Sequence, residues 1–346
     1  MTIGGSTNLF VEFLTQDTGD TTPYLIQEAV ESMAHTVLIT GANGFIGSHT
    51  TRLMESLGHK VIPVDAVPRS TDLSLLGIQT PSHIMDVTEA ASFRELCDQE
   101  KPTHIFHAAH PPRNEDPSVL NFCYHAMTNI LEAAKALKMQ RVVYSSSASI
   151  YGQLKKPDHS LVREEDAVSI YPTYFYRAAK TVSEWMGDFY KEKHGVSFVA
   201  LRYSSVYGPG LYRSIPLELK KGILGQPCRP FLTRPLDDLI YVDDVVDAIR
   251  RALFADKPLS RAYNIGLDKA YINEDLVQAI RKALPDLKFE IGQHPNAAEV
   301  APHRIRNPLD ISLAKRDLDW APEIYLEEGI ARLAKWLQEN KVRLQM

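Results

Sequence analysis

Apolar and polar residues follow two alternating patterns between residues 36 and 203. Short apolar runs such as TVLIT at 36–40 predict strands that are buried on both faces. Between these runs, apolar residues recur three and four positions apart, which predicts amphipathic helices. The predicted strands span 36–40, 60–65, 83–86, 104–109, 141–147 and 197–203. The predicted helices span 47–58, 91–99, 118–137 and 175–195.

Strands that alternate with helices in this way predict an α/β fold. We expect right-handed βαβ units and a Rossmann-type doubly wound parallel sheet with helices on both faces. After residue 203 the chain becomes irregular and rich in Pro and Gly. Regular segments return at 239–254, 263–266, 274–284 and 326–340. We expect this smaller C-terminal region to lie over the carboxyl ends of the strands, where open α/β sheets bind ligands.

The turn TGANGFIG joins the first predicted strand to the first predicted helix. Gly41 permits a tight turn, Gly44 lets the backbone approach a pyrophosphate, and Gly47 lets the helix pack closely on the strand. Phosphates would meet free N–H groups and the positive end of the helix dipole. Asp65 lies 18 residues beyond Gly47, where a carboxylate would bind the ribose hydroxyls of NAD and repel the 2′-phosphate of NADP. NAD is therefore the expected cofactor, although Arg69 keeps NADP open.

Each of these signals has a purely structural alternative. The glycines alone indicate no more than a tight strand–helix turn, and Asp65 alone could be a solvated turn residue. Asp86 ends the third predicted strand, where its carboxylate could bind the adenine amine or cap the next helix. Val87 beside it is included in the expected cofactor site.

A tyrosine and a lysine on the helix predicted over 175–195 carry the second signal. Tyr176 and Lys180 are four residues apart and share a helix face, whereas Tyr171 and Tyr174 lack this spacing. An unperturbed phenol, with a pKa of about 10, is a poor base at neutral pH. A cation about 5 Å away would lower a phenol's pKa by about two units. The phenol could then remove a hydroxyl proton as a hydride leaves the same carbon, although such a pair alone could also be simple packing.

The serine run in YSSSASIYG at 144–152 supports the catalytic interpretation. It follows the fifth predicted strand, so its hydroxyls emerge at the carboxyl edge of the sheet. A hydroxyl there can donate a hydrogen bond to the substrate oxygen that becomes a carbonyl. An ordinary serine turn is the alternative, and it is the preferred interpretation for Ser145 and Ser149.

These motifs together resemble a known family. TGANGFIG, HAAH, SSSASIYG, the Tyr176/Lys180 pair, LRYSSVYGPG, YVDDVVDAI and YNIG occur in this order. The set resembles the extended short-chain dehydrogenase/reductase superfamily, in its NAD-dependent epimerase/dehydratase branch, over about residues 35–338. The resemblance implies that Ser147, Tyr176 and Lys180 form a catalytic triad. It also implies cofactor contacts at Phe45, Ile46, Ala108, Ala109, His110 and Ser204. Tyr176 and Lys180 are expected to contact the cofactor as well as to take part in catalysis.

The expected division of the chain follows from the resemblance and the pattern. Residues 1–33 are expected to form an N-terminal extension outside the core. Residues 34–203 and 236–263 are expected to form the NAD-binding Rossmann domain. Residues 204–235 and 264–346 are expected to form the substrate-binding region.

The expected reaction is NAD-dependent hydride transfer at a carbinol of a sugar-type substrate, as in sugar or nucleotide-sugar epimerases. One alternative is a net NAD-dependent dehydrogenase of a free sugar, sugar acid or polyol. Another is a non-catalytic dinucleotide-binding regulator, which would need no proton-transfer residues. Family members that eliminate water carry acids directly after the catalytic hydroxyl, where this chain has Ala148 and Ser149. Ser205, Asp237 and Tyr124 also replace residues that are usual in nucleotide-sugar epimerases.

Composition restricts the partners. The formal net charge of −5 gives no indication of nucleic-acid or acidic-membrane binding. No apolar run reaches the roughly 18 residues that a membrane span needs. Three scattered cysteines form neither a disulfide framework nor a zinc motif, which favours a cytoplasmic location and no metal.

Two expectations concern the surface and the aromatic side chains. In the family, the helices corresponding to 118–137 and 175–195 often form a homodimer interface, so a homodimer is implied. Trp185, Phe189 and Tyr190 are expected to serve in packing rather than as an aromatic binding site.

Overall fold

The computed structural model describes residues 34–111, 116–152, 160–166, 168, 175–211, 213–227, 238–289 and 307–345. Its strands are β1 (Thr36–Thr40), β2 (Lys60–Asp65), β3 (His83–Ile84), β4 (His104–His107), β5 (Arg141–Ser147), β6 (Phe198–Tyr203), β7 (Ser205–Tyr207), β8 (Leu239–Tyr241) and β9 (Ala262–Ile265). Its helices are α3 (Phe45–Ser56), α4 (Thr71–Ser74), α5 (Ala90–Glu100), α6 (Ser118–Ala136), α7 (Phe175–His194), α8 (Ser214–Ile223), α9 (Val242–Leu253), α10 (Asn273–Ala283), α11 (Ser312–Leu318) and α12 (Leu326–Glu339), with short 3₁₀ turns η1 (Ala148–Tyr151) and η3 (Arg343–Gln345).

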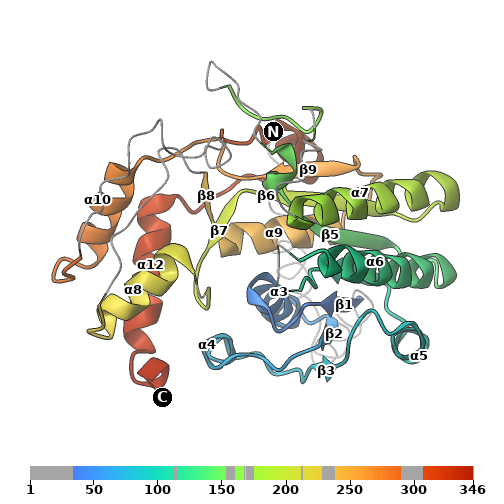
Figure 1. Cartoon of the computed structure of the whole chain (residues 1–346), viewed down its shortest axis with the longest axis horizontal. Helices are drawn as coiled ribbons and strands as arrows, with labels where there is room; N and C mark the ends of the chain where they lie inside the picture. Colours follow the sequence, from blue (N-terminus) through green and yellow to red (C-terminus); the bar gives the residue numbers. More distant parts are fainter. Residues whose placement is uncertain are drawn as a thin grey trace, which may run out of the picture.

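A seven-stranded sheet forms the centre of the molecule. Its strand order is β3-β2-β1-β4-β5-β6-β9, and every neighbouring pair is parallel. Because the chain moves outward from β1 in one direction and then outward from β4 in the other, the sheet is doubly wound. This arrangement is the predicted Rossmann-type α/β fold (Figure 1).

Alternate residues of each strand face opposite layers of helices. Val37 and Ile39 face the layer that holds α3 and α9, whereas Leu38 between them faces the layer that holds α5, α6 and α7. All three side chains are fully buried, which explains why the centre of the strand TVLIT is apolar at three consecutive positions. Each such side chain stabilises the fold by about 1.5–3 kcal/mol through burial.

A second group of elements, made of β7, β8, α8, α10 and α12, lies beside the main sheet. β7 and β8 pair in a small parallel sheet, and α12 packs against α8, α10 and β8 (Figure 1). The Asp238 carboxylate joins this group to the main sheet, since it accepts the amides of Leu267 at 2.8 Å and Leu309 at 3.1 Å. The Asp244 carboxylate on α9 likewise accepts the amides of residues 323 and 324 at 3.0 and 2.9 Å.

Local differences from the prediction have clear causes. α3 begins at Phe45, two residues before the predicted start, because the extended backbone of Gly44 already serves as its N-cap. The segment predicted as one regular element over 239–254 is divided between β8 and α9. Trp185 and Phe189, which were predicted to serve in packing, are 53% and 54% exposed, although the Phe189 ring still contacts those of Tyr190 and His194.

Three histidine rings lie around Phe254 at the amino ends of β1, β2 and β4. The ring centroids of His35 and His104 are 4.7 Å apart, and they lie 4.8 and 5.1 Å from that of Phe254. His59 completes the group, 4.6 Å from Phe254. Burial, followed by the charges of His35, Arg141 and His59, lowers the pKa of His104 to about 3. The folded protein therefore holds the His104 ring neutral at pH values where an unfolded histidine is charged.

The unfolding free energy is expected to fall as the pH drops below about 6.5, because the unfolded chain then binds protons that folded His104 does not bind. Each buried neutral histidine contributes a slope of up to about 1.4 kcal/mol per pH unit. Urea unfolding of the wild type and His104→Leu at pH 7.0 and pH 5.0 measures this contribution. The variant should lose about 2 kcal/mol less than the wild type between the two pH values. Equal losses would contradict a neutral His104 in the folded protein.

Candidate functional site

The predicted site residues meet along the carboxyl edge of the central strands. The glycine turn after β1 contacts the segment that follows β4, and the start of α7 contacts the same segment. Lys180 on α7 reaches the backbone of Ser145 in β5. Tyr171 and Tyr174 lie outside the described residues, whereas Tyr176 is within them.

The backbone of the turn requires glycine at two positions. Gly41 has a φ of +69°, and a Cβ atom there would lie 2.6 Å from the Ala109 nitrogen and 2.8 Å from the Ala108 carbonyl carbon. A Cβ atom on Gly47 would overlap the carbonyl group of Gly41. Among the described side chains none caps α3 at Gly44, so the first turn presents its N–H groups at this edge. Such a helix start suits the phosphates of a dinucleotide.

Asp65 shapes the turn as well as ending β2. Its carboxylate accepts the amide of Asn43 at 2.9 Å and the amide of Val67 at 3.2 Å. Each carboxylate oxygen can accept a further hydrogen bond, so Asp65 can still bind ribose hydroxyls. Nearby, Nε of Arg69 donates to the hydroxyl of Ser48 at 3.3 Å, and burial lowers the pKa of the Arg69 guanidinium.

The segment after β3 lies close to the same edge. The exposed Asp86 carboxylate accepts the amide and the hydroxyl of Thr88, at 2.9 and 2.8 Å, and so closes a local turn. Asp86 does not cap the next helix, because α5 begins after Glu89. The Val87 side chain is buried, and its carbonyl accepts the side-chain amide of Asn129 at 2.9 Å.

Two neutral histidines lie at the end of β4. Nδ1 of His107 lies 2.6 Å from the Thr40 hydroxyl, and burial, with the charges of Lys180 and His110, lowers the pKa of His107 to about 3. Burial and the charge of Lys180 also lower the pKa of His110 to about 3. The His110 ring meets the Tyr176 ring edge to face, with centroids 4.9 Å apart. Tyr176 therefore packs against an uncharged ring at neutral pH.

Lys180 places a buried charge beside Tyr176. Its Nζ atom donates to the Ser145 carbonyl at 2.6 Å and lies 5.6 Å from the centre of the Tyr176 ring. The same atom lies 4.8 Å from the centre of the Tyr144 ring. An ammonium group has three N–H donors, so Lys180 can also bind a ligand hydroxyl.

Ser147 is the last residue of β5 and lies at the carboxyl edge of the sheet. Its Oγ atom accepts the amide of Ser149 at 3.1 Å, at the start of the turn η1. The hydroxyl hydrogen can therefore be donated to a ligand. Ser146, the preceding residue, points to the opposite side of the strand and is buried.

Several polar atoms at this edge lack a partner within the described residues. They are Nη2 of Arg69, Nε2 of His110 and Oγ of Ser204, and all three are buried. Buried polar groups normally make hydrogen bonds, so unpaired ones along one edge fit a site that binds a polar ligand. Together with the glycine turn, they fit a dinucleotide.

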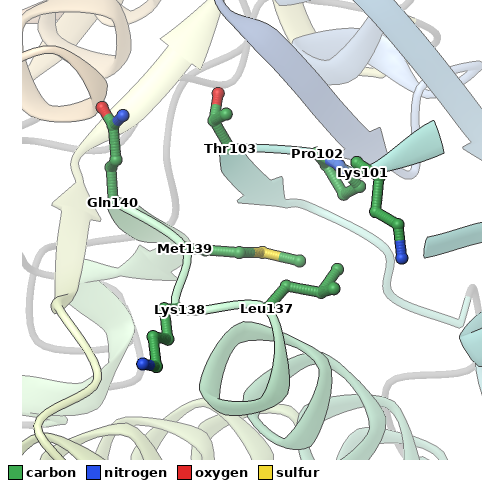
Figure 2. Close-up of a pocket in the computed structure, with 7 residues that line it drawn as sticks. All are labelled: Lys101, Pro102, Thr103, Leu137, Lys138, Met139 and Gln140. Atoms are coloured by element: carbon green, nitrogen blue, oxygen red, sulfur yellow. The ribbon is translucent and has the colours of Figure 1, made fainter. Parts of the chain in front are cut away.

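A small pocket of about 140 Å³ lies elsewhere, between the two loops that precede β4 and β5. Figure 2 shows the Met139 side chain extending between these loops. Because the pocket precedes the strands, it lies at the amino edge of the sheet, away from Ser147 and Lys180. It is also smaller than the roughly 300 Å³ or more that ligand sites of this kind occupy.

Two contributors to the site were missed in the sequence. Thr40 holds the His107 ring, and Asn129 holds the backbone of residues 87 and 88. Asn129 could have been identified from the sequence, because it lies among apolar residues of a long helix and its amide needs hydrogen-bond partners there.

Comparison with known proteins identifies the family. Residues 37–266 match the family model described as the NAD dependent epimerase/dehydratase family. The chain is 28% identical over 337 residues to UDP-glucuronate 4-epimerase 5 of Arabidopsis thaliana, with 87% of this chain and 75% of that protein covered. It is 26% identical over 339 residues to dTDP-glucose 4,6-dehydratase of Xanthomonas campestris pv. campestris, with 90% and 95% covered.

A solved structure supports the fold independently. The crystal structure of UDP-glucose 4-epimerase from Thermotoga maritima with UDP-glucose superposes with a TM-score of 0.76. That comparison covers 88% of this chain and 99% of the other at 22% identity, so it bears on the fold alone. The predicted fold class, family resemblance and NAD dependence of the family are confirmed. The chain belongs to the NAD dependent epimerase/dehydratase family, within the extended short-chain dehydrogenases/reductases.

Proposed function

We propose that this protein is an NAD-dependent enzyme that transfers a hydride at a carbinol of a sugar-type substrate, in the manner of a sugar or nucleotide-sugar epimerase. The observation that carries the proposal is the buried ammonium group of Lys180 beside the Tyr176 ring, at the sheet edge where Ser147 ends β5. A protein that only binds a dinucleotide would need no such arrangement.

Each of the three side chains has a separate task in the proposal. The Tyr176 phenolate removes the proton of the substrate hydroxyl, and in the reverse direction the phenol returns it. The Lys180 ammonium stabilises the phenolate and binds a ribose hydroxyl. The Ser147 hydroxyl donates to the substrate oxygen and orients it.

The remaining residues of the edge would hold the cofactor. NAD, when bound, supplies the carbon that accepts and returns the hydride. The glycine turn with Phe45 and Ile46 would receive the pyrophosphate, and Asp65 the ribose hydroxyls. The other proposed contacts are Arg69, Asp86, Val87, Ala108, Ala109, His110 and Ser204.

The substrate is proposed from the relatives and restricted by the local sequence. The relatives named above are a UDP-glucuronate epimerase and a dTDP-glucose dehydratase. Elimination of water needs an additional acid near the catalytic hydroxyl, but the adjacent positions hold buried Ala148 and Ser149. We therefore propose epimerisation rather than dehydration, with residues 204–235 and 264–346 forming the substrate-binding region.

The test is incubation of the protein with NAD and a panel of nucleotide sugars, free sugars and sugar acids. Product isomers without accumulation of NADH would support the epimerase. A rising NADH absorbance would instead identify a net dehydrogenase. Ser205 favours this alternative, because nucleotide-sugar epimerases usually have another residue at that position. A protein that binds NAD but converts no member of the panel would contradict the enzymatic proposal.

We also infer that the protein is a cytoplasmic homodimer. Tyr124 on α6 and Trp185 and Phe189 on α7 are all more than half exposed, at 53–54%. Trp185 and Phe189 are four apart on α7, and α6 packs along α7, so these rings belong to one helical layer. Aromatic side chains gathered on a surface favour a protein–protein interface. A cytoplasmic location is supported by Cys97 and Cys123, which are buried free thiols within the described residues.

Trp185→Glu is expected to convert the dimer to a monomer, because it places a charge in the apolar interface. Sedimentation of the wild type and the variant at micromolar concentration measures the change. Val342→Glu is the control, since Val342 is 75% exposed on a different part of the chain. A wild type that sediments as a monomer would contradict the dimer.

A further inference from the structure

Glu184 makes a set of buried contacts behind the proposed catalytic residues. It lies on α7, one turn beyond Lys180 and two turns beyond Tyr176, and it is 3% exposed. One carboxylate oxygen accepts the hydroxyl of Ser146 at 2.5 Å. Ser146 directly precedes Ser147 in β5. The contact therefore joins the helix of Tyr176 and Lys180 to the strand of Ser147.

Arg202 in β6 completes the contact from the other side. Its Nη2 atom donates to one oxygen of Glu184 at 2.7 Å, and its Nε atom donates to the other at 3.1 Å. This two-point geometry fixes the orientation of the carboxylate as well as its position. Burial alone would lower the pKa of the Arg202 guanidinium, but its hydrogen bonds and attraction to Glu184 raise it. The Arg202 guanidinium is therefore charged throughout the physiological pH range.

The same arginine is held by further buried groups. Its Nη1 atom donates to the Tyr151 hydroxyl at 2.8 Å and to the carbonyl of Glu164 at 3.0 Å. The Tyr151 hydroxyl donates in turn to Asn264 in β9 at 2.7 Å. Consequently Glu184 is positioned by three neighbouring strands and the turn after β5. A network in which these groups are paired is rigid, because any displacement leaves a buried charge unsatisfied.

The network also keeps Glu184 away from Lys180. Lysine and glutamate four residues apart on a helix commonly form an ion pair. Here both oxygens of Glu184 are occupied by Arg202 and Ser146, and Lys180 donates to the Ser145 carbonyl instead. No salt bridge joins Lys180 to an acid within the described part of the chain. Its charge is therefore available to the Tyr176 phenol and to a ligand.

We propose that Glu184 is a positioning residue for Tyr176 and Lys180, held by Ser146 and Arg202 so that α7 keeps its register against β5. This proposal rests on the proposed function, in which Tyr176 and Lys180 carry the proton transfer. Glu184 itself does not touch the substrate or the cofactor.

Ser146→Ala is the most selective test, because it removes one contact of Glu184 and leaves the Arg202 pair in place. We expect kcat to fall about tenfold and KM to stay within about twofold, since small misplacements of catalytic groups mainly affect the transition state. Glu184→Gln should produce a larger loss of kcat, together with a lower Tm, because it leaves Arg202 buried without its counter-ion.

Asp244→Asn is the matched control. It weakens a buried carboxylate that binds two backbone amides away from the site, so it should lower Tm without changing kcat. If Ser146→Ala lowers Tm as much as Asp244→Asn and leaves kcat unchanged, the role of the contact is only structural and the proposal is wrong.

Crystal structures of the wild type and Ser146→Ala test the proposal without a measurement of enzymatic activity. We expect the hydrogen bond from Lys180 to the Ser145 carbonyl, 2.6 Å here, to lengthen or break in the variant. An unchanged position of Lys180 and Tyr176 would overturn the proposal. A wild type that binds NAD but converts no substrate would refute the proposed function, and this structural comparison would still decide whether Glu184 positions α7.

Discussion

Tyr176→Phe is expected to lower the rate of hydride transfer by about 10²- to 10⁴-fold, the usual contribution of a general acid–base group. The variant loses only the hydroxyl, so the ring should keep its edge-to-face contact with His110 and the helix should stay folded. NAD binding should remain close to that of the wild type, because the glycine turn and Asp65 are untouched. Single-turnover hydride transfer and calorimetric NAD binding measure the two effects separately.

Tyr190→Phe is the control for this variant. Tyr190 lies on the same helix, and its hydroxyl donates to Glu132 on α6, away from the sheet edge. Its removal should leave hydride transfer unchanged. If Tyr176→Phe instead retained the full rate, proton transfer through this phenol would be excluded. If it also retained full function in cells, a dinucleotide-binding regulator would become the better description.

Gly47→Ala is expected to weaken NAD binding strongly and to destabilise the protein. The added Cβ would overlap the carbonyl of Gly41 and approach Ala42 Cα at 2.9 Å, and backbone atoms cannot rotate away as a flexible side chain can. The turn must therefore open, at a cost of about 1–3 kcal/mol for overpacking. Thermal unfolding and NAD titration measure the two consequences.

Gly77→Ala separates the effect of crowding from that of replacing a glycine. Gly77 has a φ of +76° and no atom within 4 Å of an added Cβ, so the change costs about 1 kcal/mol through backbone strain alone. It should leave NAD affinity unchanged. Equal NAD affinity in Gly47→Ala and the wild type would show that the close packing of α3 on β1 does not shape the cofactor site.

The central sheet could be predicted because its signals are local. Runs such as TVLIT have consecutive apolar residues at their centre, a pattern that is typical of a strand buried on both faces. The boundaries of α6 and α7 were predicted to within one residue for the same reason, since their apolar residues repeat with helical spacing. The irregular region after β6 gave no such pattern, and the pairing of β7 with β8 depends on contacts between distant residues.

In the candidate site too, the features set by neighbouring residues could be predicted, and those set by contacts between distant residues could not. The glycine turn and the spacing of Tyr176 and Lys180 could be identified because each follows from a few consecutive residues. The contacts of Glu184 could not, because Ser146, Arg202 and Tyr151 meet it only after the strands are assembled. Likewise, the exposure of Trp185 and Phe189 could not be inferred, since an aromatic pair four residues apart on a helix fits a core as well as a surface.

The carboxylate of Asp238 has a wider consequence for how the molecule unfolds. This buried carboxylate accepts hydrogen bonds from the backbone amides of Leu267 and Leu309. If either segment unfolds, a buried carboxylate oxygen therefore loses its hydrogen bond. Local opening of the C-terminal portion is thereby linked to loss of the central sheet. A dinucleotide that binds only the native state would then protect the distant helices α10 and α12 from unfolding, although it need not touch them.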